Sequence, residues 1–268
     1  MLWGYIAIIS YLLTTAWLGM TIARTDGGHK LSWNTGIPAL LTAALVFHGF
    51  ALYQLAMTSE GISLGFYSAL SLISWIVVLL VFVVSILKPA DNLALVFLPA
   101  AAIALLLQLL MPHTYILPDD LGLGLRMHIL LSVTAYSMLT IAAVQALLLA
   151  FQERQLRNKH PARSIRLLPP MQSMENLLVQ LLAIGFFLLS LSLSTGLVFV
   201  NDIFAQHLSH KVVFSILAWL IFALVLWGRW IWGWRGRKLI RWTLGGFGLL
   251  LLAYFGSKFV LELVLQKV

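Results

Sequence analysis

Long apolar runs alternate with short polar segments along the whole chain. The hydrocarbon core of a membrane is about 30 Å thick and a helix rises about 1.5 Å per residue, so a span needs roughly 20 residues. Eight runs reach that length: 2–23, 35–57, 64–87, 91–111, 126–152, 176–200, 211–232 and 242–265. None of them shows the period-two alternation of a membrane-spanning strand, so the backbone must satisfy its hydrogen bonds within helices. The pattern predicts an all-α polytopic integral membrane protein, a bundle of about eight transmembrane helices forming a single transmembrane domain over residues 1–268.

Composition agrees with this prediction. Hydrophobic residues make up 61% of the 268 residues and charged residues only 10%, and the mean hydropathy is +0.97, well outside the range of water-soluble domains. Little of the chain is left over for a soluble domain. The first run is a full span followed by Arg24 and Lys30, without the small-residue cleavage site of a signal peptide, so we expect it to stay in the membrane.

The net charge of +8 is explained by membrane topology. If the chain starts outside, 13 of the 17 basic residues lie on the inner side, and the outer side keeps four. This distribution follows the positive-inside rule and predicts that both termini are outside. It also makes a nucleic-acid partner unnecessary, and we expect a multi-pass protein of the bacterial inner (cytoplasmic) membrane. The inner residues are Arg24, Lys30, Lys88, Arg154, Arg157, Lys159, Arg163, Arg166, Arg229, Arg235, Arg237, Lys238 and Arg241.

Two inner segments carry much of this charge. The loop at 153–176 has five basic residues and three prolines; the simpler interpretation is that it fixes topology and touches anionic lipid headgroups, and the alternative is a docking surface for a cytoplasmic partner. The turn at 227–238 interleaves tryptophans with basic residues, which an aromatic belt with snorkelling cations explains.

Several classes of chemistry are disfavoured. No acidic or basic residue lies in the middle of a run, so coupling to protons or cations through buried carboxylates is not expected. The chain has no cysteine, which excludes disulfides and thiolate metal sites. Paired catalytic carboxylates are also missing, and we do not expect an enzyme. Export of a small hydrophobic or anionic molecule is a further alternative.

Histidines are the remaining candidates. His48 lies deep in the second run, where it either hydrogen-bonds to a neighbouring helix or acts as a ligand. His128 opens the fifth run, as an interfacial residue or as a ligand. His207 and His210 are three residues apart and share a helix face if the seventh helix begins early. Neutral imidazoles beside apolar, aromatic surroundings suit axial ligation of haem.

Several stretches together resemble one known family. They are "FHGFAL" with "GFYSALSLISW", "MHILLSVTAY", "LPPMQSMENLLVQLLAIGFFLLSLSLSTG", and "HKVVFSILAWLIFALVLWGRWIWGWRGRK" with "GGFGLLLLAYFG". Over most of its length the chain resembles the cytochrome c assembly family of CcsA- and CcmC-type haem-handling proteins, in particular the shorter branch of YpjD- and HemX-like inner-membrane proteins. The resemblance implies a single domain of the cytochrome c assembly type, with haem-ligand positions at His48 in the membrane and at His128 on the outer side.

The sequence departs from that family at three places. The tryptophan-rich signature expected before Lys211 is replaced by "NDIFAQHLSHK", Trp227 stands where the family has a second transmembrane histidine, and no histidine follows the last "YFG". His207 or His210 would then replace the missing outer ligand, and Arg126 would face a haem propionate or hold the helix end among the headgroups.

Two hypotheses follow from the resemblance. In the first, the protein binds or handles haem in cytochrome c maturation through His48 and His128, with a maturation protein as partner. In the second, it is a non-enzymatic accessory or scaffold membrane subunit that kept the fold and lost haem delivery.

Overall fold

The computed structural model describes residues 1–24, 36–58, 61–63, 65–88, 90–111, 116–117, 122–157, 168–199 and 209–256. The chain divides into two compact units. The first comprises residues 1–119 with 161–169, and the second comprises residues 120–160 with 170–268.

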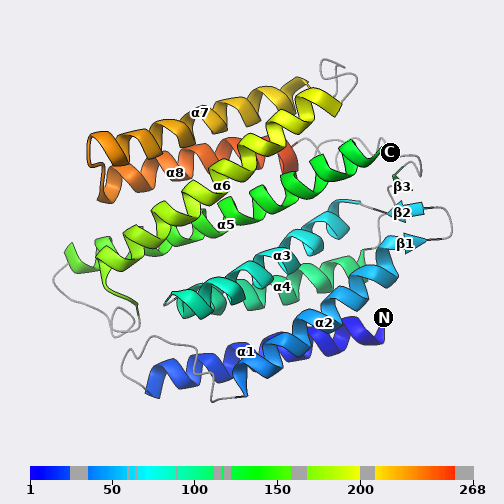
Figure 1. Cartoon of the computed structure of the whole chain (residues 1–268). Coiled ribbons are helices and arrows are strands. Elements are labelled where there is room, and N and C mark those ends of the chain that lie inside the picture. Colours follow the sequence, from blue (N-terminus) through cyan, green and yellow to red (C-terminus); the bar gives the residue numbers. More distant parts are fainter. Residues whose placement is uncertain are drawn as a thin grey trace. The chain divides into compact units, whose positions relative to one another are not determined.

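Four helices form the first unit: α1 (Leu2–Arg24), α2 (Ile37–Ala56), α3 (Phe66–Leu87) and α4 (Asp91–Leu110). Successive helices run in opposite directions (Figure 1). Helix α1 packs against α2 and α4, and α3 packs against the same two helices, so the four form a closed ring. This is the arrangement of an up-and-down four-helix bundle.

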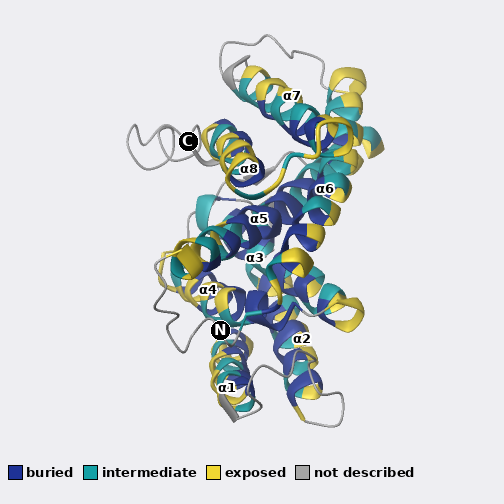
Figure 2. Ribbon diagram, turned by 90° about the vertical axis from the view of Figure 1, so that its left-hand side faces the viewer, coloured by how far each residue is buried: buried dark blue, intermediate teal, exposed yellow. Residues whose placement is uncertain are grey.

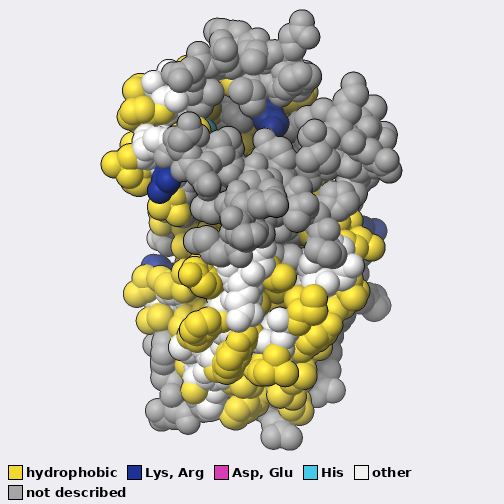
Figure 3. Space-filling model, turned by 90° about the vertical axis from the view of Figure 1, so that its right-hand side faces the viewer, with side chains coloured by type: hydrophobic (Ala, Val, Ile, Leu, Met, Phe, Trp, Pro, Cys, Tyr) yellow, Lys and Arg dark blue, Asp and Glu magenta, His cyan; other side chains and the backbone are white. Residues whose placement is uncertain are grey.

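The centre of this bundle is made of small and branched apolar side chains. Ala7, Ala51, Leu105 and Leu109 form one buried cluster, and Figure 2 shows such buried positions on the helix faces that turn toward neighbours. The opposite faces carry exposed hydrophobic side chains, among them Leu12, Leu13, Phe50 and Tyr53. Figure 3 shows a largely hydrophobic described surface over this unit, as expected for helices that face lipid.

A small antiparallel sheet joins the loops at one end of the first unit. Strand β2 (Gly61–Ser63) pairs with β1 (Met57–Thr58) and with β3 (Ile116–Leu117). The sequence did not predict these strands, because segments of two or three residues are too short to show period-two alternation. They lie outside the apolar runs and leave the all-α fold class unchanged.

The second unit is also a ring of four helices. It contains α5 (Leu123–Arg157), α6 (Met171–Phe199), α7 (Ser209–Ile231) and α8 (Gly236–Leu251), which continues into a short π-helical turn, η2 (Leu252–Gly256). Each helix packs against the next, and α8 packs back against α5.

Small residues bring α5 and α6 close together. Helix α5 buries Ala135, Ala142 and Ala146, and Gly185 of α6 lies against Leu139, where a Cβ would come within 2.7 Å of the leucine Cδ2. Without a hydrophobic driving force between helices in lipid, such close contact is a main source of helix association.

The turn from α7 to α8 depends on two glycines. Gly233 and Gly236 have φ angles of +64° and +53°, a conformation that costs little only for glycine. The Gly236 amide donates to Glu175 Oε1 at 2.8 Å, so a carboxylate of α6 caps the start of α8.

Each of the eight predicted runs overlaps one of the α-helices α1 to α8 among the described residues. Seven of the described helices, α1 to α7, are long and apolar enough to cross a membrane, and the chain is a polytopic membrane protein. The boundaries differ most at α8, which begins at residue 236 and not at 242; the glycine turn sets this start, and basic residues occupy the first turns. The predicted stretch from 257 to 265 lies outside the described residues.

Candidate functional site

His128 lies near the start of α5 and is half-buried against α6. Its Nδ1 is 2.9 Å from the backbone carbonyl oxygen of Ser192 and 3.3 Å from Thr195 Oγ1. A carbonyl oxygen only accepts hydrogen bonds, so Nδ1 carries a proton. In the uncharged form of the ring, the second nitrogen, Nε2, carries no proton and keeps its lone pair.

The surroundings of His128 Nε2 leave that lone pair weakly engaged. Its neighbour is Ser132 Oγ, at 3.4 Å. The Ser132 hydroxyl donates to the carbonyl of His128 at 2.7 Å and lies 2.7 Å from Ser192 Oγ. The single hydroxyl proton of Ser132 is therefore used in a shorter bond, and the contact with Nε2 is at the limit of hydrogen bonding.

A glycine on α6 makes room for the imidazole. A Cβ at Gly196 would lie 2.9 Å from Cε1 of His128, closer than non-bonded carbon atoms pack. Position 196 must therefore be glycine, or the ring must move. The start of α5 and the end of α6 thus hold the His128 ring by a carbonyl, two hydroxyls and one glycine.

Aromatic side chains lie deeper in the same unit. Tyr136, two turns along α5 from His128, is buried beside the rings of Phe247 and Tyr254, with centroid distances of 5.9 and 5.8 Å. Trp219 of α7 donates to Ser190 Oγ at 2.8 Å and stacks on Phe186. Tyr136 and Trp219 thus give this unit aromatic side chains in its interior.

His48 lies in the first unit and has very different surroundings. Its side chain is fully buried, with no exposed surface. Nδ1 lies 3.0 Å from Tyr11 Oη of α1, and Nε2 lies 3.0 Å from Ser71 Oγ of α3. One hydroxyl donates to the ring and the other accepts from it, whichever tautomer is present. Both nitrogens are used, so His48 as arranged does not fit the role of a haem ligand.

The other predicted site residues are less well defined. Arg126 is exposed on the first turn of α5, two residues before His128. The backbone of His210 belongs to the first turn of α7, its side chain is outside the description, and His207 lies outside the described residues. Helix α7 begins at Ser209, after His207, so the described residues do not test whether His207 and His210 share a helix face.

Sequence reasoning missed the groups that hold the two histidines. Ser132 is four residues after His128, a spacing that could have been noticed, and the polar run "SLSLST" that contains Ser192 and Thr195 is unusual inside an apolar helix. No such signal in the sequence marks the Ser192 carbonyl. None marks Tyr11 and Ser71, which are the hydrogen-bond partners of His48.

Comparison with known proteins gives consistent matches. The family described as Cytochrome C assembly protein matches residues 37–265. Inner membrane protein YpjD of Escherichia coli is 33% identical over 265 residues, 97% of each chain. The chain belongs to the cytochrome c assembly protein family.

More distant members match shorter parts of the chain. An uncharacterized 28.8 kDa protein of Azospirillum brasilense is 34% identical over 146 residues, 54% of each chain. Cytochrome c biogenesis protein CcsA of a Synechococcus strain is 29% identical over 121 residues, 39% of this chain and 35% of that protein. No solved structure matches.

These matches confirm the family resemblance seen in the sequence and the predicted location in the inner membrane. This family member is a multi-pass protein of the bacterial inner membrane, given its similarity to YpjD and its apolar helices. At the position compared with the family's second transmembrane histidine, the Trp227 residue of α7 is 59% exposed. A tryptophan at the surface of its own unit, in place of a histidine, leaves that ligand position without an imidazole.

Proposed function

We propose that this member of the cytochrome c assembly family binds haem at the outer end of α5 and handles it during cytochrome c maturation, without catalysing covalent chemistry. The single observation that carries the proposal is the orientation of His128. Its Nδ1 is bound to the Ser192 carbonyl at 2.9 Å, and its Nε2 keeps an available lone pair. Ligand histidines in proteins are held in the same way, with one nitrogen donating to a carbonyl and the other facing the metal.

Haem would supply two anionic propionates and an iron that binds imidazole nitrogens. His128 would hold the iron through Nε2. Arg126 is exposed two residues before it, and a guanidinium forms charge-assisted hydrogen bonds with a carboxylate. His207 or His210 is the candidate for a second histidine that would hold the iron.

His48 has a structural role in this proposal. If the His48 ring turned toward a ligand, the buried hydroxyls of Tyr11 and Ser71 would lose their hydrogen bonds to it. We therefore assign it to the packing of α1, α2 and α3, and not to the haem.

The absorption spectrum of the purified protein, expressed with haem supplied, tests the proposal. We expect a Soret band in the wild type, a band weakened at least several-fold in His128→Ala, and an undiminished band in the control His48→Gln, in which the amide keeps a donor and an acceptor. A colourless wild-type protein would overturn the proposal. Equal loss in both variants would show that His48 is also a ligand.

A second function is favoured by a separate observation. Of the transmembrane histidine pair that the family resemblance implies, His48 has both ring nitrogens in hydrogen bonds, and the exposed Trp227 stands in place of the other histidine. An accessory or scaffold subunit that lost haem delivery would have these features. For such a subunit, simultaneous replacement of His128, His207 and His210 would leave genetic complementation intact, whereas haem handling through His128 requires that complementation fails.

A further inference from the structure

A hollow of about 530 Å³ lies at the opposite end of α5 from His128. It is lined by residues 150, 153, 154 and 157 of α5 and by residues 237, 240 and 241 of α8. The spacings of three and four residues place each set on one face of its helix. The hollow therefore lies between the facing surfaces of two packed helices of the same unit.

Most of the lining is basic. Four arginines, Arg154, Arg157, Arg237 and Arg241, surround the hollow with one acidic residue, Glu153. Like charges repel one another, so a bound anion would stabilise this group of arginines. The excess of positive charge within a single concave site favours an anionic ligand.

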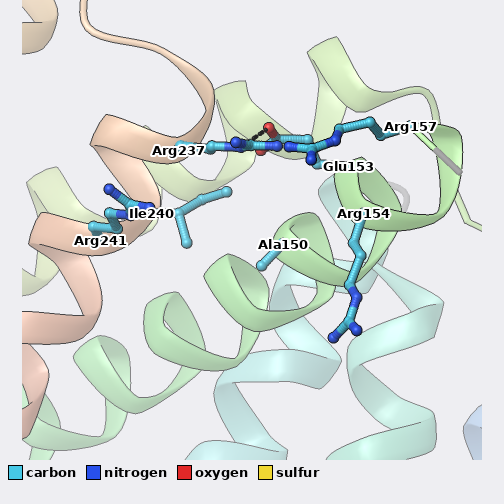
Figure 4. Close-up of a pocket in the computed structure, with 7 residues that line it drawn as sticks. All are labelled: Ala150, Glu153, Arg154, Arg157, Arg237, Ile240 and Arg241. Atoms are coloured by element: carbon cyan, nitrogen blue, oxygen red, sulfur yellow. Dashed lines mark hydrogen bonds and ion pairs between the residues drawn. The ribbon is translucent and has the colours of Figure 1, made fainter.

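Glu153 neutralises only one of the four guanidinium groups. Arg237 Nε donates to Glu153 Oε1 at 2.7 Å, and within the described parts of the chain Arg237 alone of the four has an ion pair. Figure 4 shows Arg157 and Arg237 on either side of Glu153, with Arg154 extending away from it. The arginine side chains are exposed, so they can turn toward a bound anion without breaking buried contacts.

The floor of the hollow is apolar. Ile240 is buried and Ala150 is half-buried beneath the charged rim. The charge distribution along the chain places this end of α5 and α8 on the inner side of the membrane. A charged rim above an apolar floor, at the level of the headgroups, matches the polar and apolar parts of a lipid better than a free ion in water.

We propose that the inner ends of α5 and α8 bind the phosphate headgroup of an anionic membrane lipid. Arginine suits a phosphate because its planar guanidinium donates two parallel hydrogen bonds to the oxygens. Basic pockets between transmembrane helices on the cytoplasmic side are a recurrent form of lipid site. The site is independent of the haem proposal, because it lies at the other end of α5.

The test measures lipid binding to the purified full-length protein by native mass spectrometry. The probes are phosphatidylglycerol, which is anionic, and phosphatidylcholine, which has the same phosphate and no net charge. We expect the wild type to bind phosphatidylglycerol at least tenfold more tightly. The variant Arg157→Gln with Arg241→Gln, which removes one guanidinium from each helix, should lose at least tenfold in affinity for phosphatidylglycerol.

The matched control is Lys88→Gln with Arg235→Gln, which removes two exposed charges that do not line the hollow. It should bind phosphatidylglycerol within about twofold of the wild type. An equal loss in the control and in the arginine variant would show diffuse attraction to the basic surface and would overturn the proposal.

A third variant changes affinity in the other direction. Glu153→Gln removes the carboxylate that competes with a phosphate for Arg237, so phosphatidylglycerol should bind more tightly, by roughly twofold to tenfold. Weaker binding in Glu153→Gln would contradict the proposal even if the arginine variant fails to fold. Inorganic phosphate is the last probe: if it binds in the wild type while phosphatidylglycerol shows no preference over phosphatidylcholine, the ligand is a soluble phosphate and the lipid assignment is wrong.

Discussion

His128 and His48 both lie between helices, and they differ in how their ring nitrogens are occupied. His48 has two hydroxyl partners at 3.0 Å, whereas His128 has a carbonyl at 2.9 Å on one nitrogen and a distant hydroxyl on the other. This difference decides which histidine can accept a ligand. The sequence singled out both residues, but it could not separate them, because a carbonyl such as that of Ser192 is offered by every residue type.

The hydroxyl of Tyr11 should contribute measurably to stability. In Tyr11→Phe one nitrogen of the buried His48 loses its partner, and we expect the free energy of unfolding to fall by about 1–3 kcal/mol. Thermal unfolding in detergent measures this change. Tyr5→Phe, at a tyrosine of the same helix that is 48% exposed, should have little effect, and equal effects of the two variants would contradict a structural role for the His48 contacts.

The space that Gly196 leaves for the His128 ring should affect how much haem the protein binds. In Gly196→Ala the new methyl group would lie 2.9 Å from Cε1 of His128 and push the ring from the Ser192 carbonyl. We expect the ratio of Soret to protein absorbance to fall at least twofold. Gly248→Ala, at a helical glycine with open space around it, serves as the control and should keep the ratio; an unchanged ratio in Gly196→Ala would argue against this position of the ring.

At the scale of the elements, the apolar runs predict where the helices lie. The residues that flank each run, charged side chains and glycines among them, determine where each helix begins and ends. Helix α5 extends beyond the predicted run to Arg157 and α6 begins at Met171, since helices continue into the headgroup region where charged side chains reach water. The start of α8 depends on the left-handed Gly233 and Gly236, whose conformations hydropathy does not report. The short strands escaped prediction for another reason, since two or three residues are too few to show period-two alternation.

The close contact between α5 and α6 leads to a prediction about the size of the side chains at positions 185 and 139. In Gly185→Ala the added Cβ would lie 2.7 Å from Cδ2 of Leu139, and we expect a loss of about 1–3 kcal/mol in the free energy of unfolding from overpacking. Leu139→Ala alone leaves a cavity and should cost about 2–5 kcal/mol. Gly185→Ala adds one carbon where Leu139→Ala removes three, so the two changes compensate in part, and the double variant should be more stable than the sum of the single losses predicts. Strict additivity, measured by thermal unfolding, would mean that the two side chains do not meet.

At the scale of the whole molecule, each of the two units is a ring of four helices among the described residues. Seven of these helices, α1 to α7, are long and apolar enough to span the membrane, where the sequence predicted about eight spans. The sequence predicted the membrane class and the number of apolar runs because both follow from hydrophobicity and length. It did not predict the division into two units, which depends on which helix faces meet. The assignment of both ends of the chain to the outer side is a prediction from the distribution of basic residues.

Orientation in the membrane can be measured directly, because the chain has no cysteine of its own. A single cysteine at Gly122, before α5, should react with a membrane-impermeant maleimide in intact spheroplasts. A single cysteine at Lys88 or Arg235 should react only after the membrane is broken. The reverse pattern of labelling would show that the positive-inside assignment is wrong.

The central claim is that His128 holds haem through Nε2, and imidazole rescue tests it most directly. His128→Gly, purified after expression with haem, should lack the Soret band of the wild type. Addition of imidazole and haem should restore the band, because free imidazole can occupy the space left by the side chain and supply the missing nitrogen. A wild-type band that is unchanged in His128→Gly would contradict the account, and so would a variant that stays colourless with imidazole although it is folded.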